Sequence, residues 1–288
     1  MATKPQTTAN KKLSGQAVHS GLHQLLQQAW QDLRQASAHF RKHHQDDPEA
    51  LHDLRVAMRR LRSLYQAFAP AINPRDPRPA KLREIFRRTN PLRDLEVALA
   101  LLNSLPTRLD WLEGEWQQQL DAYSAGLQDL PSAIQALDAA PDTPPQPDQQ
   151  RLGRLAAKRL RKQAKRLKGQ LKQVNKHWRD SDVHRLRIRI KKIRYLLEPF
   201  MGECRPCART VKQLKRLQDQ IGKHRDLQLL MQTLKQLAQG CNNPAQHEQL
   251  NQAIQQLKAR SAAQTKALKR ALRKPPLSRL RKAIKALK

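Results

Sequence analysis

The sequence predicts an all-α protein, and two observations carry this prediction. Leu, Gln, Ala, Arg and Lys abound, all of which favour helices, whereas glycine occurs only 9 times and aromatic residues make up 4% of the 288 residues. Segments such as 52–68 and 184–200 also place apolar residues on one side of a helix at about 100° per residue. The length suffices for one large domain or two of common size.

The first half of the chain is expected to form roughly four helices, near 14–42, 49–69, 80–103 and 108–138. Asp47-Pro48-Glu49 marks the second start, because it offers an N-cap, a proline for the first turn and an acid for the helix dipole. The proline-rich stretch Asn73–Pro79 is expected to be a loop.

The second half is expected to form helices near 151–177, 182–201, 208–239 and 245–273, with a short basic helix near 277–287. Ser181-Asp182 is expected to cap the second of these. Residues 141–150, PDTPPQPDQQ, contain four prolines and read as a linker. The predicted organisation is a flexible N-terminus (1–13), two helical bundles (14–140 and 151–288) and this linker between them.

The two halves resemble each other at an offset of 132 residues. HDLRVAMRRLRSLYQAF (52–68) aligns with HRLRIRIKKIRYLLEPF (184–200), and Arg93–Asp94 aligns with Arg225–Asp226 without a gap. Two similarities at one offset indicate an internal duplication of a unit of about 130 residues. Four helices in each unit suggest antiparallel bundles.

Each aligned segment carries a row of cations beside its apolar stripe. In the first copy the stripe is Leu54, Met58, Leu61, Tyr65 and Phe68, and in the second it is Leu186, Ile190, Ile193, Leu197 and Phe200. The cations flank these stripes, so we expect them to be half-buried, near a neighbouring helix or cleft.

Such a row is costly unless something anionic lies beside it, because like charges four residues apart repel. Arginine can grip phosphate oxygens in pairs and a histidine gains charge as pH falls. A spacing of one turn, about 5.4 Å, suits a ligand with repeated negative groups. The alternative for any single row is a solvated face, and this is the preferred interpretation of the stripe Arg154, Lys158, Arg161 and Lys165.

The two Arg-Asp pairs allow two interpretations. The aspartates could anchor neighbouring arginines in buried ion pairs, or Arg93 and Arg225 could point into the same anion site. Weaker candidates on the same predicted helices are Lys81, Arg88, Lys212 and Lys215.

The net charge of +32 is concentrated in the second half. Residues 1–144 contain 18 basic and 16 acidic side chains, whereas residues 145–288 contain 38 and 8. This charge attracts polyanions. The candidates are DNA, RNA, inorganic polyphosphate, anionic lipid and an acidic protein.

Cys204, Cys207 and Cys241 do not suggest a disulfide framework, and a reducing interior is expected. A zinc site at Cys204-x-x-Cys207 would need further ligands from Cys241, His224 or His247, so a loop pair without a role is preferred. His39, His43 and His44 are expected to be surface residues. No leader peptide or membrane span is recognisable, which predicts a cytoplasmic protein.

The pattern H-x-L-R-[VI]-x-[MI]-[RK]-[RK]-[LI]-R, found twice, resembles the signature of the CHAD domain, the conserved-histidine α-helical domain. The later R-D-L segments are also similar to that family, and the resemblance runs from about residue 14 to 273. It implies two four-helix bundles related by a pseudo-twofold axis, with a basic central channel that binds inorganic polyphosphate. It also implies association with polyphosphate granules.

The matching positions in the first copy are His52, Arg55, Arg59, Arg60, Arg62 and Arg93. In the second copy they are His184, Arg187, Lys191, Lys192, Arg194 and Arg225. Lys191 and Lys192 depart from the arginine pair of the first copy, which keeps the charge but loses the planar fork.

No catalytic residues, metal or cofactor are expected, because no phosphate-binding glycine loop, HExxH or nucleophile–base arrangement occurs. A nucleic-acid-binding or nucleoid-associated protein is the alternative, since any basic helical protein binds nucleic acid to some degree through its phosphates. The low aromatic content argues against a dedicated nucleic-acid site, because platforms for base stacking are sparse.

Overall fold

The computed structural model of the protein describes residues 15–44, 47–68, 76–138, 149–202 and 204–287, and the regular structure in these ranges is helical. The all-α prediction is therefore confirmed. The predicted N-terminus 1–13 and all but the last two residues of the predicted linker 141–150 lie outside the described residues.

The first half contains α1 (Gly15–His43), α2 (Pro48–Phe68), α3 (Arg78–Arg88), α4 (Asn90–Leu102), α5 (Asp110–Ala125) and α6 (Leu130–Asp138). The second half contains α7 (Gln149–Lys176), α8 (Asp180–Leu197), the short 3-10 helix η2 (Glu198–Phe200), α9 (Arg205–Gly240), α10 (Pro244–Arg273) and α11 (Leu277–Ala286).

Two helices predicted as continuous in the first half are broken. The predicted helix 80–103 divides into α3 and α4 at Thr89, and 108–138 divides into α5 and α6. Prolines explain both divisions: Pro91 and Pro131 each follow the first residue of the new helix, where a missing N–H costs least. The second half has Gly222–Lys223 in place of Asn90–Pro91. The helix α9 is therefore unbroken at this point and is 36 residues long in total.

The two predicted helix starts have different outcomes. Asp47 accepts a hydrogen bond from the Glu49 backbone N–H at 2.9 Å, which confirms the predicted cap of α2. The predicted cap at Ser181-Asp182 is wrong, because α8 begins at Asp180. Asp182 is instead buried in the first turn, where it accepts hydrogen bonds from Gln173 and Arg185.

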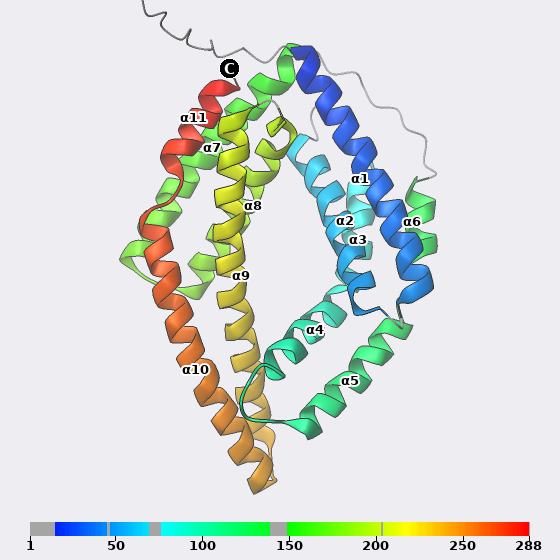
Figure 1. The fold of residues 1–288 in the computed structure, drawn as a ribbon, viewed down its shortest axis with the longest axis vertical. Coiled ribbons are helices and arrows are strands. Elements are labelled where there is room, and N and C mark those ends of the chain that lie inside the picture. Colours follow the sequence, from blue (N-terminus) through cyan, green and yellow to red (C-terminus); the bar gives the residue numbers. More distant parts are fainter. Residues whose placement is uncertain (1–14, 45–46, 69–75, 139–148, 203, 288) are drawn as a thin grey trace, which may run out of the picture.

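The helices are arranged in a ring (Figure 1). The long helices α9 and α10 pack along one side together with α7, α8 and α11, and α1, α2, α3 and α6 form the other side. At one end α4 and α5 connect the two sides, with α4 packed against α9. Near the opposite end α2 packs against α8 and α1 against α7. The centre is therefore bordered by both halves of the sequence.

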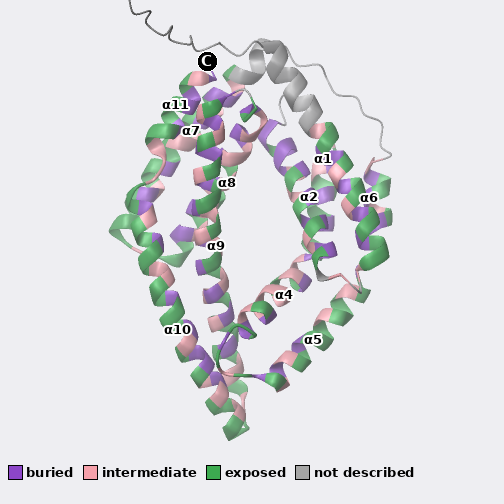
Figure 2. Cartoon of the chain, in the orientation of Figure 1, coloured by how far each residue is buried: buried purple, intermediate pink, exposed green. Residues whose placement is uncertain are grey.

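Among the described residues the hydrophobic core forms two clusters, and each draws residues from both halves. The larger includes the two predicted apolar stripes, every member of which is buried as expected. The smaller joins α4 and α5 to the far ends of α9 and α10, with Leu102 and Trp116 in the same cluster as Leu234 and Leu250. Buried residues occur where helices pack together along both sides (Figure 2). Among the helices in the described ranges, none is long and apolar enough to cross a bilayer.

Candidate anion-binding site

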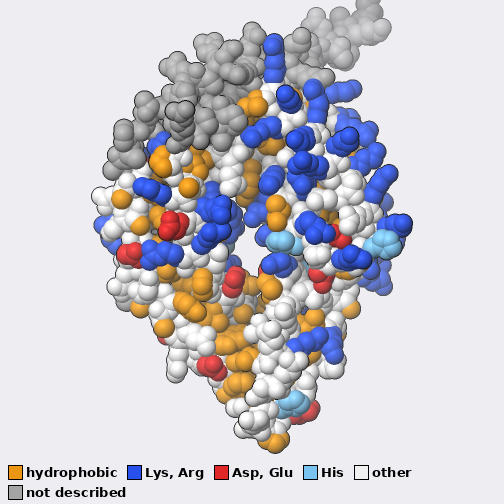
Figure 3. All heavy atoms as spheres, turned by 180° about the vertical axis from the view of Figure 1, so that it is seen from behind, with side chains coloured by type: hydrophobic (Ala, Val, Ile, Leu, Met, Phe, Trp, Pro, Cys, Tyr) orange, Lys and Arg blue, Asp and Glu red, His pale blue; other side chains and the backbone are white. Residues whose placement is uncertain are grey.

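The two predicted cation rows lie on α2 and α8, which pack against each other. Seen from behind, Lys and Arg side chains gather on both sides of the central opening (Figure 3). Arg59, Arg62, Arg187, Lys191 and Arg194 are half-buried, as the apolar stripes predict, whereas Arg55 is more deeply buried than expected.

Electrostatic interactions link the two rows directly. The pKa of Arg59 on α2 is lowered by burial and by the nearby cation Arg187 on α8, although Tyr195 opposes the shift. Burial and repulsion from Arg187, Arg59 and other row members lower the pKa of Lys191 from 10.5 to about 7. The rows thus converge closely enough for their charges to repel one another.

The aromatic ring of Phe86 on α3 is shared by three guanidinium groups of the first row. The Cζ atoms of Arg55, Arg62 and Arg59 lie 4.5, 4.6 and 5.6 Å from its centroid. The face of an aromatic ring attracts cations, so Phe86 holds these side chains together in spite of their like charge. Sequence reasoning missed Phe86; its only signal is an aromatic residue inside the basic segment LREIFRR.

Arg55 is the most deeply held member of the first row. Its guanidinium donates hydrogen bonds to the Thr89 hydroxyl and, at 3.2 Å, to Asn90 Oδ1. Both acceptors lie at the break between α3 and α4, which the sequence did not predict. Burial and the nearby cations Arg59 and Arg93 lower the pKa of Arg55 to about 10.

Arg187 is the corresponding residue of the second row and lies between α8 and α9. The position that a Cβ would occupy on Gly222 of α9 is 3.9 Å from its Nε, so the α9 backbone passes close to it. Burial and Arg225 lower its pKa, whereas the nearby carboxylate of Asp226 opposes this shift. The same carboxylate has a raised pKa because of its own burial, although Arg187, Arg93 and Arg225 act in the opposite direction.

Several polar atoms of this region are buried without a hydrogen-bond partner among the described residues. They are the Nε atoms of Arg55, Arg62 and Arg187, the hydroxyl of Tyr195, and the Nε of Arg194, which forms an ion pair with Glu198 Oε1 at 3.5 Å. A buried donor without a partner costs about 1–3 kcal/mol. The sequence did not single out Tyr195. The Cζ atom of Arg194 lies over its ring, 4.7 Å from the ring centroid. The site therefore contains unused hydrogen-bonding capacity as well as excess charge.

The two signature histidines have different surroundings. His184 Nδ1 lies 3.0 Å from Arg225 Nη1, and burial together with Arg225, Arg187 and Lys191 lowers its pKa. His52 instead lies with the carboxylates of Glu49 and Asp53, whose ligand atoms are all within 4.8 Å of one another. A neutral His184 can accept the hydrogen bond from Arg225 and so orient that guanidinium.

Other candidate residues are engaged elsewhere or exposed. Arg60 pairs with Asp32 of α1, Arg88 with Asp129 at the start of α6, and Arg93 with Glu96 one turn along α4. The charge of Arg93 nevertheless lowers the pKa values of Arg55, Arg59 and Asp226, so Arg93 lies near these groups. The exposed candidates are Lys81, Lys192, Lys212 and Lys215.

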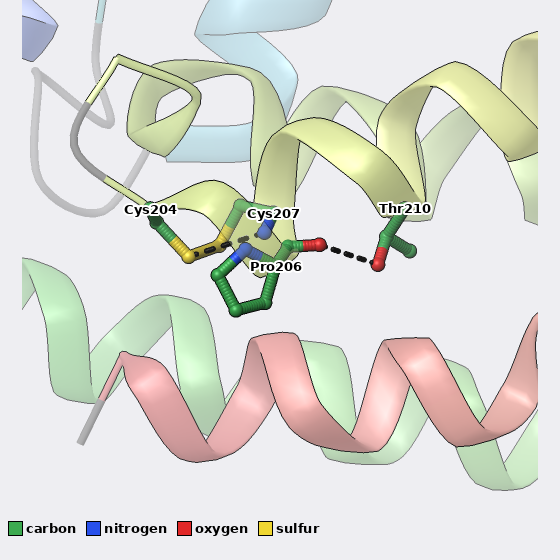
Figure 4. Close-up of a disulfide and its surroundings, with 4 residues drawn as sticks. All are labelled: Cys204, Pro206, Cys207 and Thr210. Atoms are coloured by element: carbon green, nitrogen blue, oxygen red, sulfur yellow. Dashed lines mark hydrogen bonds between the residues drawn. A yellow bond between two sulfur atoms is a disulfide. The ribbon is translucent and has the colours of Figure 1, made fainter. Parts of the chain in front are cut away.

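The structure corrects the interpretation of the cysteines. Cys204 and Cys207 form a disulfide at the start of α9, whereas the sequence suggested a reduced pair without a role (Figure 4). Cys204 caps the helix, since its Sγ accepts a hydrogen bond from the Cys207 N–H at 3.2 Å. With the sulfurs joined to each other and His224 bonded to Asp180, the zinc alternative is not supported.

The fold and the convergent cation rows together define a helical protein whose cations gather around a central opening. The family model described as "CHAD domain" matches residues 24–235 and 205–288, and the chain belongs to this family. The predicted family membership is confirmed.

Solved structures of the same fold agree. The structure titled "Crystal structure of the CHAD domain from the plant Ricinus communis" aligns with a TM-score of 0.63 at 20% identity, covering 100% of this chain and 98% of that one. PptA from Streptomyces chartreusis aligns with a TM-score of 0.59 at 17% identity, covering 91% and 99%. A comparison with curated proteins gave no match.

Proposed function

We propose that the protein binds inorganic polyphosphate at its centre, along the cation rows of α2 and α8. The single observation that carries this proposal is the cluster of half-buried cations whose charges are balanced by few acids. Lys191 illustrates it, since the charged groups with the largest effects on its pKa are four arginines from both rows. A chain of phosphates would supply negative charge at each turn of both helices.

The hydrogen-bonding inventory supports the same ligand. Arginine Nε atoms and a tyrosine hydroxyl are the donors left unsatisfied, and these groups match phosphate oxygens. In this proposal Arg59, Arg187 and Lys191 contact the chain directly. Phe86 positions the first row, and His184 positions Arg225. Arg55 is held by Thr89 and Asn90, so it contributes charge from below the surface.

The proposed mode of action is binding without chemistry, and association with polyphosphate granules follows from it. Nucleic acid is the second candidate ligand, but bases need stacking partners, and the aromatic side chains of the site already carry guanidinium groups. The duplication of two units about the central site is likewise proposed, supported by the equivalent places of Arg59 and Lys191 in the two rows.

The test uses immobilised long-chain polyphosphate and interferometry at physiological salt. The variant Arg187→Gln with Lys191→Gln should bind at least about tenfold more weakly, since charge-assisted hydrogen bonds contribute about 1.5–3 kcal/mol each. The control is Lys162→Gln with Lys168→Gln, which removes two cations from the exposed surface of α7.

Equal losses in both variants would show that net charge alone governs binding and would contradict the proposal. A competition with duplex DNA and RNA at matched phosphate concentration decides between ligands, and polyphosphate should win. Release of phosphate from polyphosphate or triphosphate in the presence of a divalent metal would overturn the non-enzymatic mode of action.

A further inference from the structure

A second concentration of positive charge lies on α10, outside the central site. A cavity of about 730 Å³ is lined by Met231 of α9 and by a set of α10 residues. The α10 residues are Lys258, Ser261, Ala262, Thr265, Lys266, Lys269, Arg270 and Arg273. Five of these are cations, and α10 contains no acidic residue after Glu248.

The arrangement follows from helix geometry. Lys258, Ala262, Lys266 and Arg270 form one row of every fourth residue, and Ser261, Thr265, Lys269 and Arg273 form the row beside it. The two rows extend from Lys258 to Arg273, a span of 16 residues or about 22 Å along the helix axis. None of the five cations has an ion pair among the described residues, so no carboxylate there offsets their mutual repulsion. This length and charge suit a chain of several anionic groups.

Two hydroxyl groups of this surface are held in place from behind. Ser261 is buried, and its oxygen accepts a hydrogen bond from Gln228 Nε2 at 2.8 Å, which leaves its own O–H free to donate. Thr265 Oγ1 lies 3.3 Å from Nδ1 of the buried His224, whose Nε2 lies 3.0 Å from Asp180. The α10 surface is therefore a hollow with oriented polar groups at its base.

The aromatic neighbour of the cavity favours a bare phosphate chain over nucleic acid. Trp178 packs edge-on against His224 at 5.6 Å, and Lys269 Nζ lies 5.1 Å from its ring centroid. The ring is thus occupied by protein groups, and none of the described residues that line the cavity is aromatic. Bases would find no stacking partner here, whereas phosphates need only cations and hydroxyls.

We infer that α10 carries a second polyphosphate-binding site, formed by Lys258, Ser261, Thr265, Lys266, Lys269, Arg270 and Arg273. This inference rests on the proposed function. The helices α8 and α9 separate α10 from the central opening, so the two sites bind different stretches of one chain, or two chains (Figure 1). Two sites on one molecule raise the apparent affinity for long chains and allow separate chains to be bridged.

The experiment counts binding equivalents of tripolyphosphate by calorimetry at physiological salt. The α10 variant replaces Lys266, Lys269, Arg270 and Arg273 with Gln. Its matched control replaces four exposed cations of α7, Lys158, Arg161, Lys165 and Lys168, with Gln, which removes the same charge from a helix surface. The central variant is Arg187→Gln with Lys191→Gln. Circular dichroism confirms that each variant is folded before binding is measured.

Two equivalents are expected for the wild type and the α7 control, and one for each of the other variants. A different result would overturn the α10 site and leave the proposed function intact. In that case the wild type and the α10 variant each bind one equivalent, and the central variant binds none. Binding that is unchanged in the central variant and lost in the α10 variant would contradict the central site instead. Displacement from α10 by duplex DNA more readily than by polyphosphate, at matched phosphate, would assign this site to nucleic acid and overturn the inference.

Discussion

The rings of Phe68 and Phe200 lie 6.4 Å apart, although 132 residues separate them in sequence. Phe68 ends α2 and Phe200 ends η2, directly after α8, so the two apolar stripes meet at these side chains. Because each cation row flanks its stripe, contact between the stripe ends also brings the cation rows toward each other. Core packing and site assembly are therefore coupled.

Phe68→Ala and Phe200→Ala should each lower the free energy of unfolding by about 3–5 kcal/mol, because both rings are buried in the larger cluster. The double variant should lose less than the sum, with a coupling of about 0.5–1.5 kcal/mol for the ring pair. Urea denaturation of the four proteins measures this coupling. Strictly additive losses would mean that the two rings do not stabilise each other.

Polyphosphate binding should be accompanied by proton uptake at pH 8. The pKa of Lys191 is about 7 in the free protein, so most molecules carry a neutral Lys191 at this pH. A polyanion offsets the repulsion from the neighbouring arginines, raises the pKa of Lys191 and favours its protonated form. Calorimetry in two buffers of different ionisation enthalpy measures the uptake, which should disappear in Lys191→Met.

The stability of the free protein should respond to the same group. The folded pKa of Lys191 lies below its unfolded value of 10.5, so the unfolded state binds more protons between pH 7 and 10.5. The contribution of Lys191 to the free energy of unfolding is unfavourable at pH 7, and it becomes less unfavourable as the pH rises through this interval. The Tm of the wild type relative to Lys191→Met should increase from pH 7 to pH 9, and a flat or falling difference would contradict the cause given for the low pKa.

Phe86→Leu should weaken polyphosphate binding beyond its effect on stability. The three guanidinium groups around this ring lose an attraction of about 0.5–2 kcal/mol each, and their like charges then separate. Phe40→Leu is the control, since Phe40 is also a buried ring, lies on α1 and stacks on His44, and no cation–π pair with a row arginine is found for it among the described residues. Both variants should show a reduced Tm, and interferometry should show weaker binding only for Phe86→Leu.

The contribution of the Cys204 cap of α9 to stability should be measurable separately from that of the disulfide. Cys204→Ser with Cys207→Ala keeps an oxygen that can accept the hydrogen bond of the residue-207 N–H, whereas Cys204→Ala with Cys207→Ala removes it. The alanine variant should be less stable than the serine variant by about 1 kcal/mol. Denaturation of both proteins under reducing conditions measures this difference. Equal stabilities would show that the Cys204 acceptor contributes nothing as a cap.

The helical content, the buried stripes and the half-buried cation rows could be predicted because they depend on local periodicity. Residues three and four apart share a helix face wherever the helix lies, so the burial of Leu54, Leu61 and Ile190 followed from spacing alone. The breaks at Pro91 and Pro131 were missed because the apolar pattern continues across them. The start of α8 was placed two residues late because Asp182 resembles a cap, while its carboxylate in fact bonds to Gln173 of α7.

By itself, the sequence determined the fold class, the charge and the identity of the two cation rows, since each depends on composition or on spacing along one helix. Only the tertiary structure decided which side chains from distant segments meet. It placed Phe86 among three arginines, paired Arg60 with Asp32 and Arg88 with Asp129, and brought Lys191 close to Arg59. The physical reason is that these contacts depend on how helices cross, and helix crossing is set by the packing of whole surfaces, which no local pattern encodes.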